Sequence, residues 1–451
     1  MKEQKLFIKT YGCQMNIYDS ERMATMLAMH GYSMAKTLEE ANLVLLNTCH
    51  IREKATEKVF SELGRIKPLK ESKRKKGETL NIAVAGCTAQ AEGKEIGRRA
   101  PYVDLIVGPQ SYHELPEMLE QLKRKKKNGS GAKQAVGTAF STIEKFDALN
   151  KPHTHKGPTA FLTIQEGCDK FCHFCVVPYT RGAEFSRSVD AIIEEAQRLV
   201  DQGAIEITLL GQNVNAYHGT YSKSSKEINL GRLCYELAQH VPGIKSLRYI
   251  TCHPRDVHNE QIEAHRDIDI LQPFLHLPIQ SGSDEILKRM NRKHTVANYI
   301  SVIERFRAAQ PKIAFSSDFI VGYPGETKQH FLETLQLVQD VFFAQAFSFK
   351  YSIRPGTSAG FLEDQLSEEE KGERLQMLQQ LLGAQQLKFN KDLYNTTTPA
   401  LFDRQGKEPG SYIGRTPYLQ PVHVVSNKNI LGKILPVYIT HAGPNSLNGK
   451  L

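Results

Sequence analysis

Residues 159–175 read TAFLTIQEGCDKFCHFC, and this stretch decides how the rest of the sequence is divided. Its apolar first half predicts a buried strand over residues 160–166. Three cysteines follow that strand in a single loop, Cys168, Cys172 and Cys175. Three thiolates at this spacing suit a 4Fe–4S cluster and leave one iron without a protein ligand. A zinc site would need a fourth ligand, which His173 could supply, so the spacing alone leaves both metals open.

After this loop the sequence alternates between short apolar runs and amphipathic helical stretches. Six parallel strands covered by helices predict an open, partial TIM-like (β/α)6 barrel. The cysteine loop then lies at the C-terminal edge of the strands, where such barrels build active sites, and this position favours a reactive centre over structural zinc. The expected strands are 160–166, 206–211, 246–252, 274–280, 314–321 and 346–352, and the helices are 188–202, 230–241, 257–267, 284–290, 296–309 and 327–342.

The N-terminal segment predicts a doubly wound α/β domain with a parallel sheet. Cys13, Cys49 and Cys87 each come immediately after one of its strands. Because parallel strands end at one edge of a sheet, the three thiols are expected to converge there. A single buried cysteine is more often a small apolar side chain, but three in equivalent positions indicate a ligand set. The expected strands are 5–12, 43–48, 81–86 and 104–108, and the helices are 18–31, 52–66 and 112–126.

Composition changes mark the other domain boundaries. A basic stretch rich in Gly, Ser and Ala between the two α/β segments predicts a flexible linker. After a helix at 367–391, short runs of alternating residues with Gly and Pro turns predict a small β-barrel. The predicted organisation is therefore an N-terminal domain at 1–122, a linker at 123–155, a barrel domain at 156–386 and a C-terminal domain at 387–451.

Length, charge and cysteine usage narrow the class of protein. The 451 residues suffice for about three domains, and 40% hydrophobic residues exclude global disorder. With no apolar run near the ~18 residues of a membrane span and no signal peptide, we expect a cytoplasmic protein without a membrane partner. Eight cysteines are too few for a disulfide scaffold and suit thiol ligands instead. The net charge is +9, and the basic residues are concentrated in residues 65–76, 122–133 and 386–451. Such clusters suit either the binding of a polyanion or a solvated surface.

The cysteine loop, with Phe174 before its last cysteine, resembles the signature of the radical S-adenosylmethionine (SAM) enzymes. Further motifs resemble the methylthiotransferases within that superfamily, over nearly the whole chain, and the tail is similar to the TRAM RNA-binding module. These motifs are YGCQMN (11–16), NTCHIREKA (47–55), AGC (85–87), VVPYTRGAEFSR (176–187), LLGQNVNAY (209–217), LPIQSGS (277–283), DFIVGYPGET (318–327) and YSIRPGTSA (351–359).

The resemblance implies two 4Fe–4S clusters and SAM as cofactors. The barrel cysteines would ligate a cluster that binds SAM and cleaves it to a 5'-deoxyadenosyl radical, and Cys13, Cys49 and Cys87 would ligate an auxiliary cluster that delivers sulfur. One SAM would methylate the sulfur, and a second would remove hydrogen from carbon 2 of an adenine. Gln14 and Met15 are similar to the subgroup that modifies N6-dimethylallyladenosine beside the anticodon of tRNA. The sibling subgroups act on threonylcarbamoyladenosine or on a ribosomal protein.

Weaker assignments follow from position and residue type. The sequence does not identify catalytic residues beyond the cluster ligands. Cys234 is expected to pack as core, and Cys252 stands where the family usually has serine. Besides a tRNA anticodon loop, the expected partners are an electron donor and a sulfur or cluster supplier of unknown identity. A non-catalytic, zinc-bearing RNA-binding protein is the alternative of another class, and the tail could instead bind protein. The candidates for contacts with SAM are Phe174, Gln212, Asn213 and Asp318. Arg181 and Arg187 are candidates for binding the SAM carboxylate or an RNA phosphate. The candidates for contacts with RNA are Lys407, Tyr412, Arg415, Tyr418 and Lys433.

Overall fold

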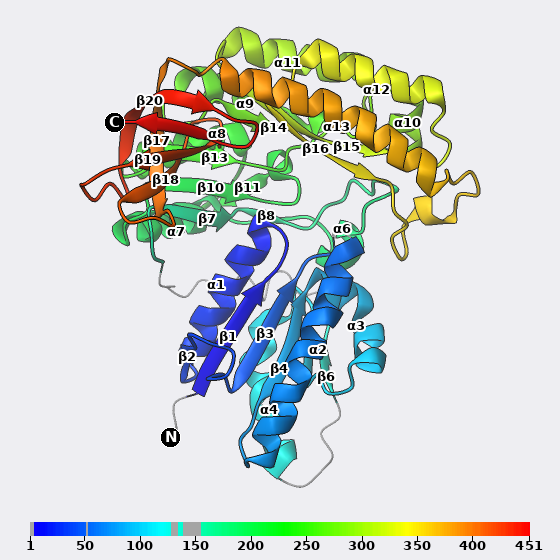
Figure 1. Cartoon of the computed structure of the whole chain (residues 1–451), viewed down its shortest axis with the longest axis vertical. Coiled ribbons are helices and arrows are strands. Elements are labelled where there is room, and N and C mark those ends of the chain that lie inside the picture. Colours follow the sequence, from blue (N-terminus) through cyan, green and yellow to red (C-terminus); the bar gives the residue numbers. More distant parts are fainter. Residues whose placement is uncertain (1–3, 51–52, 128–133, 139–154) are drawn as a thin grey trace. The chain divides into compact units, whose positions relative to one another are not determined.

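The computed structural model (Figure 1) describes residues 4–50, 53–127, 134–138 and 155–451. Its contacts divide the chain into two compact units, each taken by itself below. Unit 1 is Met1–Thr154 with Glu166–Asp169 and Cys175–Phe185, and unit 2 is His155–Gln165 with Lys170–Phe174 and Ser186–Leu451.

Unit 1 is built on a six-stranded parallel sheet in the order β2-β1-β3-β4-β5-β6. Side chains that alternate along the strands pack against α1 and α4 on one face and against α2 and α3 on the other. Residues Leu43 and Leu45 of β3 illustrate one face, and Val44 and Leu46 the other. This arrangement confirms the predicted doubly wound fold. The elements are β1 (Gln4–Thr10), α1 (Gln14–Ala28), β2 (Tyr32–Met34), β3 (Leu43–Thr48), α2 (Glu53–Lys75), β4 (Asn81–Gly86), α3 (Cys87–Arg99), β5 (Leu105–Val107), α4 (Leu115–Lys127), β6 (Ala135–Gly137) and α6 (Val177–Arg181).

Strands β2 and β6 and helices α3 and α6 of unit 1 were not expected. Strands β2 and β6 have only three residues each, too few for a period to show. Helix α3 contains Gly93 and Gly97, and its backbone leaves helical geometry at Glu92, so its sequence lacks a clear apolar stripe. Strand β6 falls within the predicted linker and pairs with β5, whereas most of residues 123–155 lies outside the described residues.

Unit 2 contains six parallel strands in two sheets, β13-β10-β7 and β14-β15-β16. A parallel bridge between Leu247 and Leu271 connects the sheets, and apolar side chains from the strands and the outer helices form one continuous core. The predicted open barrel is therefore confirmed, with an unexpected hairpin, β11–β12, inserted after β10. The elements are β7 (Thr159–Thr163), α7 (Val189–Asp201), β10 (Glu206–Leu210), β11 (His218–Tyr221), β12 (Ser224–Asn229), α8 (Leu230–His240), β13 (Ser246–Tyr249), α9 (Asn259–Asp267), β14 (Phe274–His276), α10 (Asp284–Arg289), α11 (Val296–Ala309), β15 (Ala314–Val321), α12 (Lys328–Val341), β16 (Gln345–Lys350) and α13 (Glu368–Lys391).

The tail of unit 2 folds into a closed five-stranded barrel, as the alternating sequence predicts. Its core centres on the fully buried Phe402 and Val422. Closure is completed by a parallel pairing of β19 with β21, while the other pairs are antiparallel. The strands are β17 (Thr397–Gln405), β18 (Ser411–Arg415), β19 (Pro421–Val425), β20 (Ile434–Ala442) and β21 (Leu447–Lys450).

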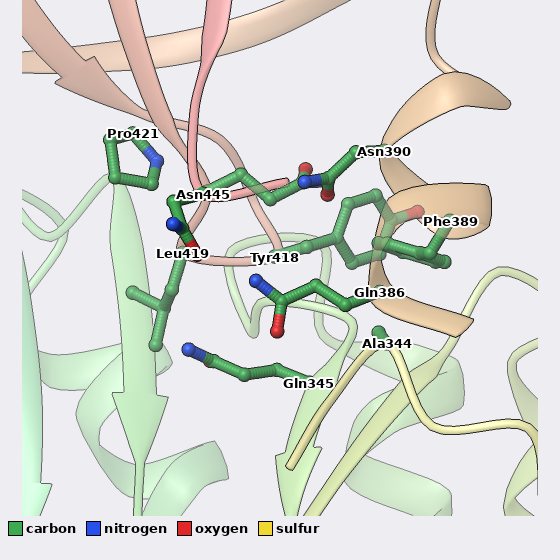
Figure 2. Close-up of a pocket in the computed structure, with 10 residues that line it drawn as sticks. Ala344, Gln345, Gln386, Phe389, Asn390, Tyr418, Leu419, Pro421 and Asn445 are labelled. Atoms are coloured by element: carbon green, nitrogen blue, oxygen red, sulfur yellow. The ribbon is translucent and has the colours of Figure 1, made fainter. Parts of the chain in front are cut away.

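Amide side chains and one buried ion pair hold this small barrel to the rest of unit 2. Figure 2 shows a pocket between the start of β16, the end of α13 and the tail. Around it Asn390 donates to the carbonyl of Gly443 at 2.8 Å and Gln386 to that of Pro444 at 2.7 Å. The pocket lies at the N-terminal end of β16, the edge opposite to the one that carries the cysteine loop, so it is a seam in the fold and is not assigned to the active site.

Two short strands, β8 (Gln165–Glu166) and β9 (Phe185–Ser186), flank the cysteine loop in the sequence.

No helix in the described ranges of the chain has both the length and the apolarity needed to cross a bilayer.

Candidate functional site

Cys13, Cys49 and Cys87 converge at the C-terminal edge of the sheet in unit 1. Cys13 precedes α1, Cys49 follows β3, and Cys87 is the first residue of α3. Their approach depends on Gly12, which has φ +114°, because a Cβ added there would lie 2.2 Å from Cβ and 3.2 Å from Sγ of Cys49. Gly86, at φ +91°, allows an equally close approach to the carbonyl of Thr48.

Hydrogen bonds from threonine hydroxyls fix the two strand ends that carry the cysteines. Thr48 Oγ1 donates to the carbonyl of Ala85 at 2.7 Å, and Thr88 Oγ1 donates to the carbonyl of Cys49 at 2.9 Å. At the start of α1, the Cys13 thiol contacts Asn16 Oδ1 at 3.9 Å. The three cysteines therefore follow neighbouring strands at one edge of the sheet, and Cys13 interacts with both of the other thiols.

The electrostatics of the three thiols differ. A side-chain hydrogen bond with Cys49 and the nearby Arg181 guanidinium lower the pKa of Cys13 from 9.0 to about 6. Burial instead raises the pKa of Cys87, although Arg181 also acts on this thiol and opposes the shift. Of these two thiols, Cys13 therefore loses its proton at the lower pH.

The donor set at this edge fits an iron–sulfur cluster. It offers three sulfur ligands, which are what 4Fe–4S clusters use, from three rigid strand ends. Among the described residues, no three Cys, His, Asp or Glu side chains are grouped so that they could hold a single metal ion. In a 4Fe–4S cluster each thiolate binds a different iron, so its ligands do not meet at one point.

The second group of cysteines lies where the two units meet in the sequence. Cys168 and Cys175 belong to unit 1, and Cys172 belongs to unit 2. In unit 1 the backbone N–H of Cys168 donates to the carbonyl of Gly182 at 3.2 Å, and a Cβ on Gly167 would lie 1.9 Å from the carbonyl of Ala183. The segments on either side of the loop are thus held tightly together.

In unit 2 the middle of the loop is held against the end of α10. His173 donates its backbone N–H to the carbonyl of Met290 at 3.1 Å, and its Nδ1 lies 2.8 Å from the carbonyl oxygen of Arg289. Cys172 is buried, with Arg292 Nη1 at 3.5 Å from its Sγ. Phe174 packs against an apolar cluster; the other members of this cluster include Ile286, Met290, Tyr323, Tyr351 and Ile320.

The candidate SAM residues lie near the ends of the barrel strands. Asn213 is buried, donates from Nδ2 to Asp256 Oδ2 at 2.6 Å, and has no hydrogen-bond partner for Oδ1 within the described structure. Asp256 also pairs with Lys170 of the cysteine loop at 2.7 Å. The backbone N–H of Gln212 donates to Gln165 Oε1 at 2.9 Å. A buried acceptor without a partner is typical of a site that binds a polar ligand.

Asp318 faces the interior of the barrel. Its neighbours in β15, Phe315 and Phe319, pack on the opposite face into the core with the outer helices. Asp318 Oδ2 lies 3.6 Å from Nε2 of His276, whose Nδ1 is 2.8 Å from Ser316 Oγ. Its side chain keeps 31% of its surface exposed, so the carboxylate remains accessible to a ligand in the barrel.

Two of the predicted anion-binding residues are corrected by the structure. Arg181 is only 2% exposed and pairs with Asp19 at 2.7 Å and Glu166 at 3.1 Å. Arg187 is likewise buried, with Glu195 at 2.8 Å and the carbonyl of Thr163 at 2.7 Å. Neither guanidinium has a free face for a SAM carboxylate or an RNA phosphate.

The tail requires a similar correction. Tyr412 is buried in the barrel core, and Tyr418 donates to the carbonyl of Lys312 at 3.1 Å and packs edge-on against Phe389. Arg415 pairs with Asp403 at 2.7 Å. Lys407 and Lys433 are exposed. The tail tyrosines that are exposed are Tyr394 and Tyr438, and Lys450 Nζ lies 5.5 Å from the centre of the Tyr438 ring.

Several residues around the cysteines were not predicted from the sequence. Asn16 and Asp19 follow the first cysteine on α1 and face the site, at the helical spacing of three that could have indicated them. Glu166 precedes the second motif by two residues. For Arg292, which contacts Cys172, no local signal exists, because 120 residues separate the two in the chain.

Comparison with known proteins agrees with this geometry. Residues 5–108 match the uncharacterized protein family UPF0004, and residues 162–338 match the radical SAM superfamily. Together they indicate a radical SAM methylthiotransferase-like enzyme. The radical SAM match includes all three cysteines of the loop, and the UPF0004 match includes Cys13, Cys49 and Cys87.

Solved structures of other proteins have a similar fold. The radical SAM methyltransferase TsrM from Kitasatospora setae, solved with cobalamin and a 4Fe–4S cluster, has a TM-score of 0.55 at 12% identity, covering 80% of this chain and 77% of TsrM. The cobalamin-dependent SAM radical enzyme OxsB has a TM-score of 0.51 at 12% identity, covering 83% of this chain and 56% of OxsB. At this level of identity the likeness concerns the fold alone.

Proposed function

We propose that the protein is a MiaB-type tRNA-2-methylthio-N6-dimethylallyladenosine synthase. In this function it installs a methylthio group on carbon 2 of N6-dimethylallyladenosine at position 37 of tRNA, next to the anticodon. The observation that carries the proposal is the convergence of Cys13, Cys49 and Cys87 at one sheet edge, in a chain that also has a radical SAM domain.

The six cysteines divide into two ligand sets in this proposal. Cys168, Cys172 and Cys175 would hold the cluster that binds SAM, and the N-terminal three would hold the second cluster. When bound, the two clusters and two SAM molecules supply the sulfur, the methyl group and the one-electron chemistry that replaces the C2–H bond by a C2–S bond. Asn213 Oδ1 and the Asp318 carboxylate are the chain's proposed polar contacts to SAM, with Gln212 and Phe174 beside them.

An RNA substrate is supported by the charge and the surface of the tail. The adenine must leave its stack to reach a buried cluster, and a single-stranded loop makes this inexpensive. Exposed Lys407 and Lys433 would hold phosphates, and the exposed rings of Tyr394 and Tyr438 are suited to stacking on unpaired bases. Part of the basic run at 65–76 is used internally, since Lys73 donates to the carbonyl of Ala41 at 2.8 Å.

The proposal is tested by nucleoside analysis of tRNA from a deletion strain complemented with cysteine variants. The intact chain should restore the 2-methylthio nucleoside, and it should carry about eight irons when reconstituted without oxygen. Ala at Cys168, Cys172 and Cys175 should abolish SAM cleavage. Ala at Cys13, Cys49 and Cys87 should leave unproductive SAM cleavage but no methylthio product.

Three outcomes would contradict the proposal. Unchanged product from the N-terminal variant would exclude sulfur delivery from this site. A methylthio group on threonylcarbamoyladenosine or on a ribosomal protein would assign a sibling function. A colourless, zinc-containing protein without SAM cleavage would indicate the non-catalytic RNA-binding alternative.

A further inference from the structure

Arg181 lies against the three-cysteine site of unit 1. Its Nη2 is 3.3 Å from Asn16 Oδ1, the same oxygen that the Cys13 thiol contacts at 3.9 Å. Its guanidinium also acts on Cys87, through a hydrogen bond and through its charge. Arg181 therefore lies close to two of the three thiols, those of Cys13 and Cys87, although it belongs to the segment that follows the radical SAM motif.

The position of this guanidinium is fixed by a buried network. Asp19 accepts from Nη2 at 2.7 Å and Glu166 accepts from Nη1 at 3.1 Å. The carboxylates are held in turn, since Tyr112 donates to Asp19 at 3.0 Å and Gln110 donates to Glu166 at 3.0 Å. Gln110 also donates to the backbone carbonyl of Arg181 at 2.7 Å. With every partner buried, the guanidinium cannot swing out to bind a mobile ligand.

A fixed charge in such a place has a specific consequence for iron–sulfur chemistry. The reduction potential of a cluster depends on the charge around it and on hydrogen bonds to its sulfurs. Burial increases the effect, because little water is present to screen the charge. Burial alone would lower the pKa of Arg181. The nearby charges of Asp19, Cys87 and Glu166 instead raise this pKa well above the ordinary value, so the guanidinium stays protonated.

We propose that Arg181 is a positioning residue for the cluster held by Cys13, Cys49 and Cys87, and that its fixed positive charge raises the reduction potential of this cluster. The inference rests on the proposed function, because it requires a cluster at these cysteines. It also reassigns Arg181 from RNA or SAM binding to the sulfur-delivering site.

The experiment uses the full chain with Cys168, Cys172 and Cys175 changed to Ala, so that only the N-terminal site can be loaded. The cluster is titrated with dithionite under argon and followed by absorbance and electron paramagnetic resonance. Arg181→Gln should lower the ratio of reduced to oxidised cluster at least tenfold at a fixed solution potential. This change equals a shift of about 59 mV to more negative potential for a one-electron couple. Arg181→Lys, which keeps the charge, should stay close to the parent.

Two further variants separate charge from structure. Asp19→Asn removes one negative charge, keeps the shape of the side chain, and should shift the potential in the opposite direction. Arg187→Gln is the matched control, because Arg187 is also buried and paired with a glutamate but belongs to the other unit, and it should leave the potential unchanged. If Arg181→Gln does not fold, the shift in reduction potential of Asp19→Asn still tests the proposed role of the charge.

The outcomes distinguish this inference from the proposed function. If the parent binds no iron and sulfide at the N-terminal cysteines, the auxiliary cluster itself is wrong. If the parent carries a cluster and its potential is the same in Arg181→Gln, Arg181→Lys and Asp19→Asn, the cluster stands and the role of Arg181 is overturned. A shift in Arg187→Gln equal to that in Arg181→Gln would also overturn it, because the effect would then be structural.

Discussion

Arg181 donates from Nη2 to Oδ2 of Asp19 at 2.7 Å, although 162 residues separate them in the chain. Asp19 lies on α1, which starts directly after Cys13, and Arg181 ends α6, which follows Cys175 closely. The ion pair therefore joins the neighbourhoods of the two cysteine motifs within one compact unit. Removing Arg181 would leave the buried carboxylates of Asp19 and Glu166 without their cation, and breaking a buried ion pair in this way typically costs about 3–5 kcal/mol.

We expect Gly12→Ala to prevent loading of the N-terminal cysteines. The new Cβ would lie 2.2 Å from Cβ of Cys49, and the backbone at φ +114° already disfavours any side chain. Iron analysis after reconstitution should show about half of the iron of the parent, as for the loss of one of two clusters. Gly77→Ala is the control, since it has φ +73° but no atom within 4 Å of its added Cβ. Equal iron in both variants would count against the close approach.

The metal-free protein should show pH-dependent alkylation at Cys13. Because its pKa is lowered to about 6, the reactive thiolate is present above that pH and is lost as the pH falls through it. The rate of carbamidomethylation, followed by peptide mass analysis, should rise between about pH 5 and pH 7 and then level off. Burial raises the pKa of Cys87, so its labelling should stay slow up to pH 9. Equal rates at the two cysteines at pH 7 would refute this assignment.

Arg248→Met should loosen the C-terminal barrel. Arg248 pairs with the buried Glu206 at 2.7 Å and donates to the carbonyls of Thr416 and Pro417. Loss of the guanidinium leaves the Glu206 carboxylate with the Ser246 hydroxyl at 2.7 Å and a longer contact to Arg415 at 3.7 Å, so we expect the free energy of unfolding to fall by about 3 kcal/mol. Urea unfolding measures this change, and limited proteolysis should release the tail.

Arg232→Met provides the control for that experiment, because the Arg232 side chain is 53% exposed and its partner Glu236 also has His240 at 3.3 Å, so the substitution should cost less than about 1 kcal/mol. Equal losses of stability in the two variants would mean that the contacts of Arg248 do not hold the C-terminal barrel in place.

Asp318→Asn should weaken SAM binding by roughly tenfold, corresponding to about 1.4 kcal/mol for a lost hydrogen bond to a charged acceptor. The substitution keeps the shape of the side chain that faces the barrel interior beside His276. Isothermal titration with SAM measures the change in Kd. Asp340→Asn, on the exposed surface of α12, should bind like the parent. An unchanged Kd for SAM together with weaker RNA binding would move Asp318 to the substrate site.

The backbone plan could be predicted because hydrophobic periodicity is set by local burial. The runs at 43–46 and 81–86 are buried on both faces, and this is why they appear as continuous apolar stretches. The convergence of Cys13, Cys49 and Cys87 followed from the rule that parallel strands end at one edge. Elements without such a pattern, such as β6 and the hairpin β11–β12, were missed for the same reason.

Side-chain roles were harder to predict because they depend on distant partners. An arginine beside a cysteine motif suggests an anion ligand, but the buried Asp19 and Glu166 already occupy Arg181. A tyrosine in a strand of alternating residues can point either into the barrel or to its outer surface, and Tyr412 points into the barrel core. Sequence alone does not show these long-range choices.

The glycines before Cys13 and Cys87 set where the thiols are, whereas the lengths of α1 and α2 do not. Insertions or deletions in the loops between these helices and the next strands would leave the three sulfur atoms in place. Chains with very different separations between these cysteines could therefore build the same centre, and a search for distant kin should score Gly-Cys pairs at strand ends while ignoring the gaps between them.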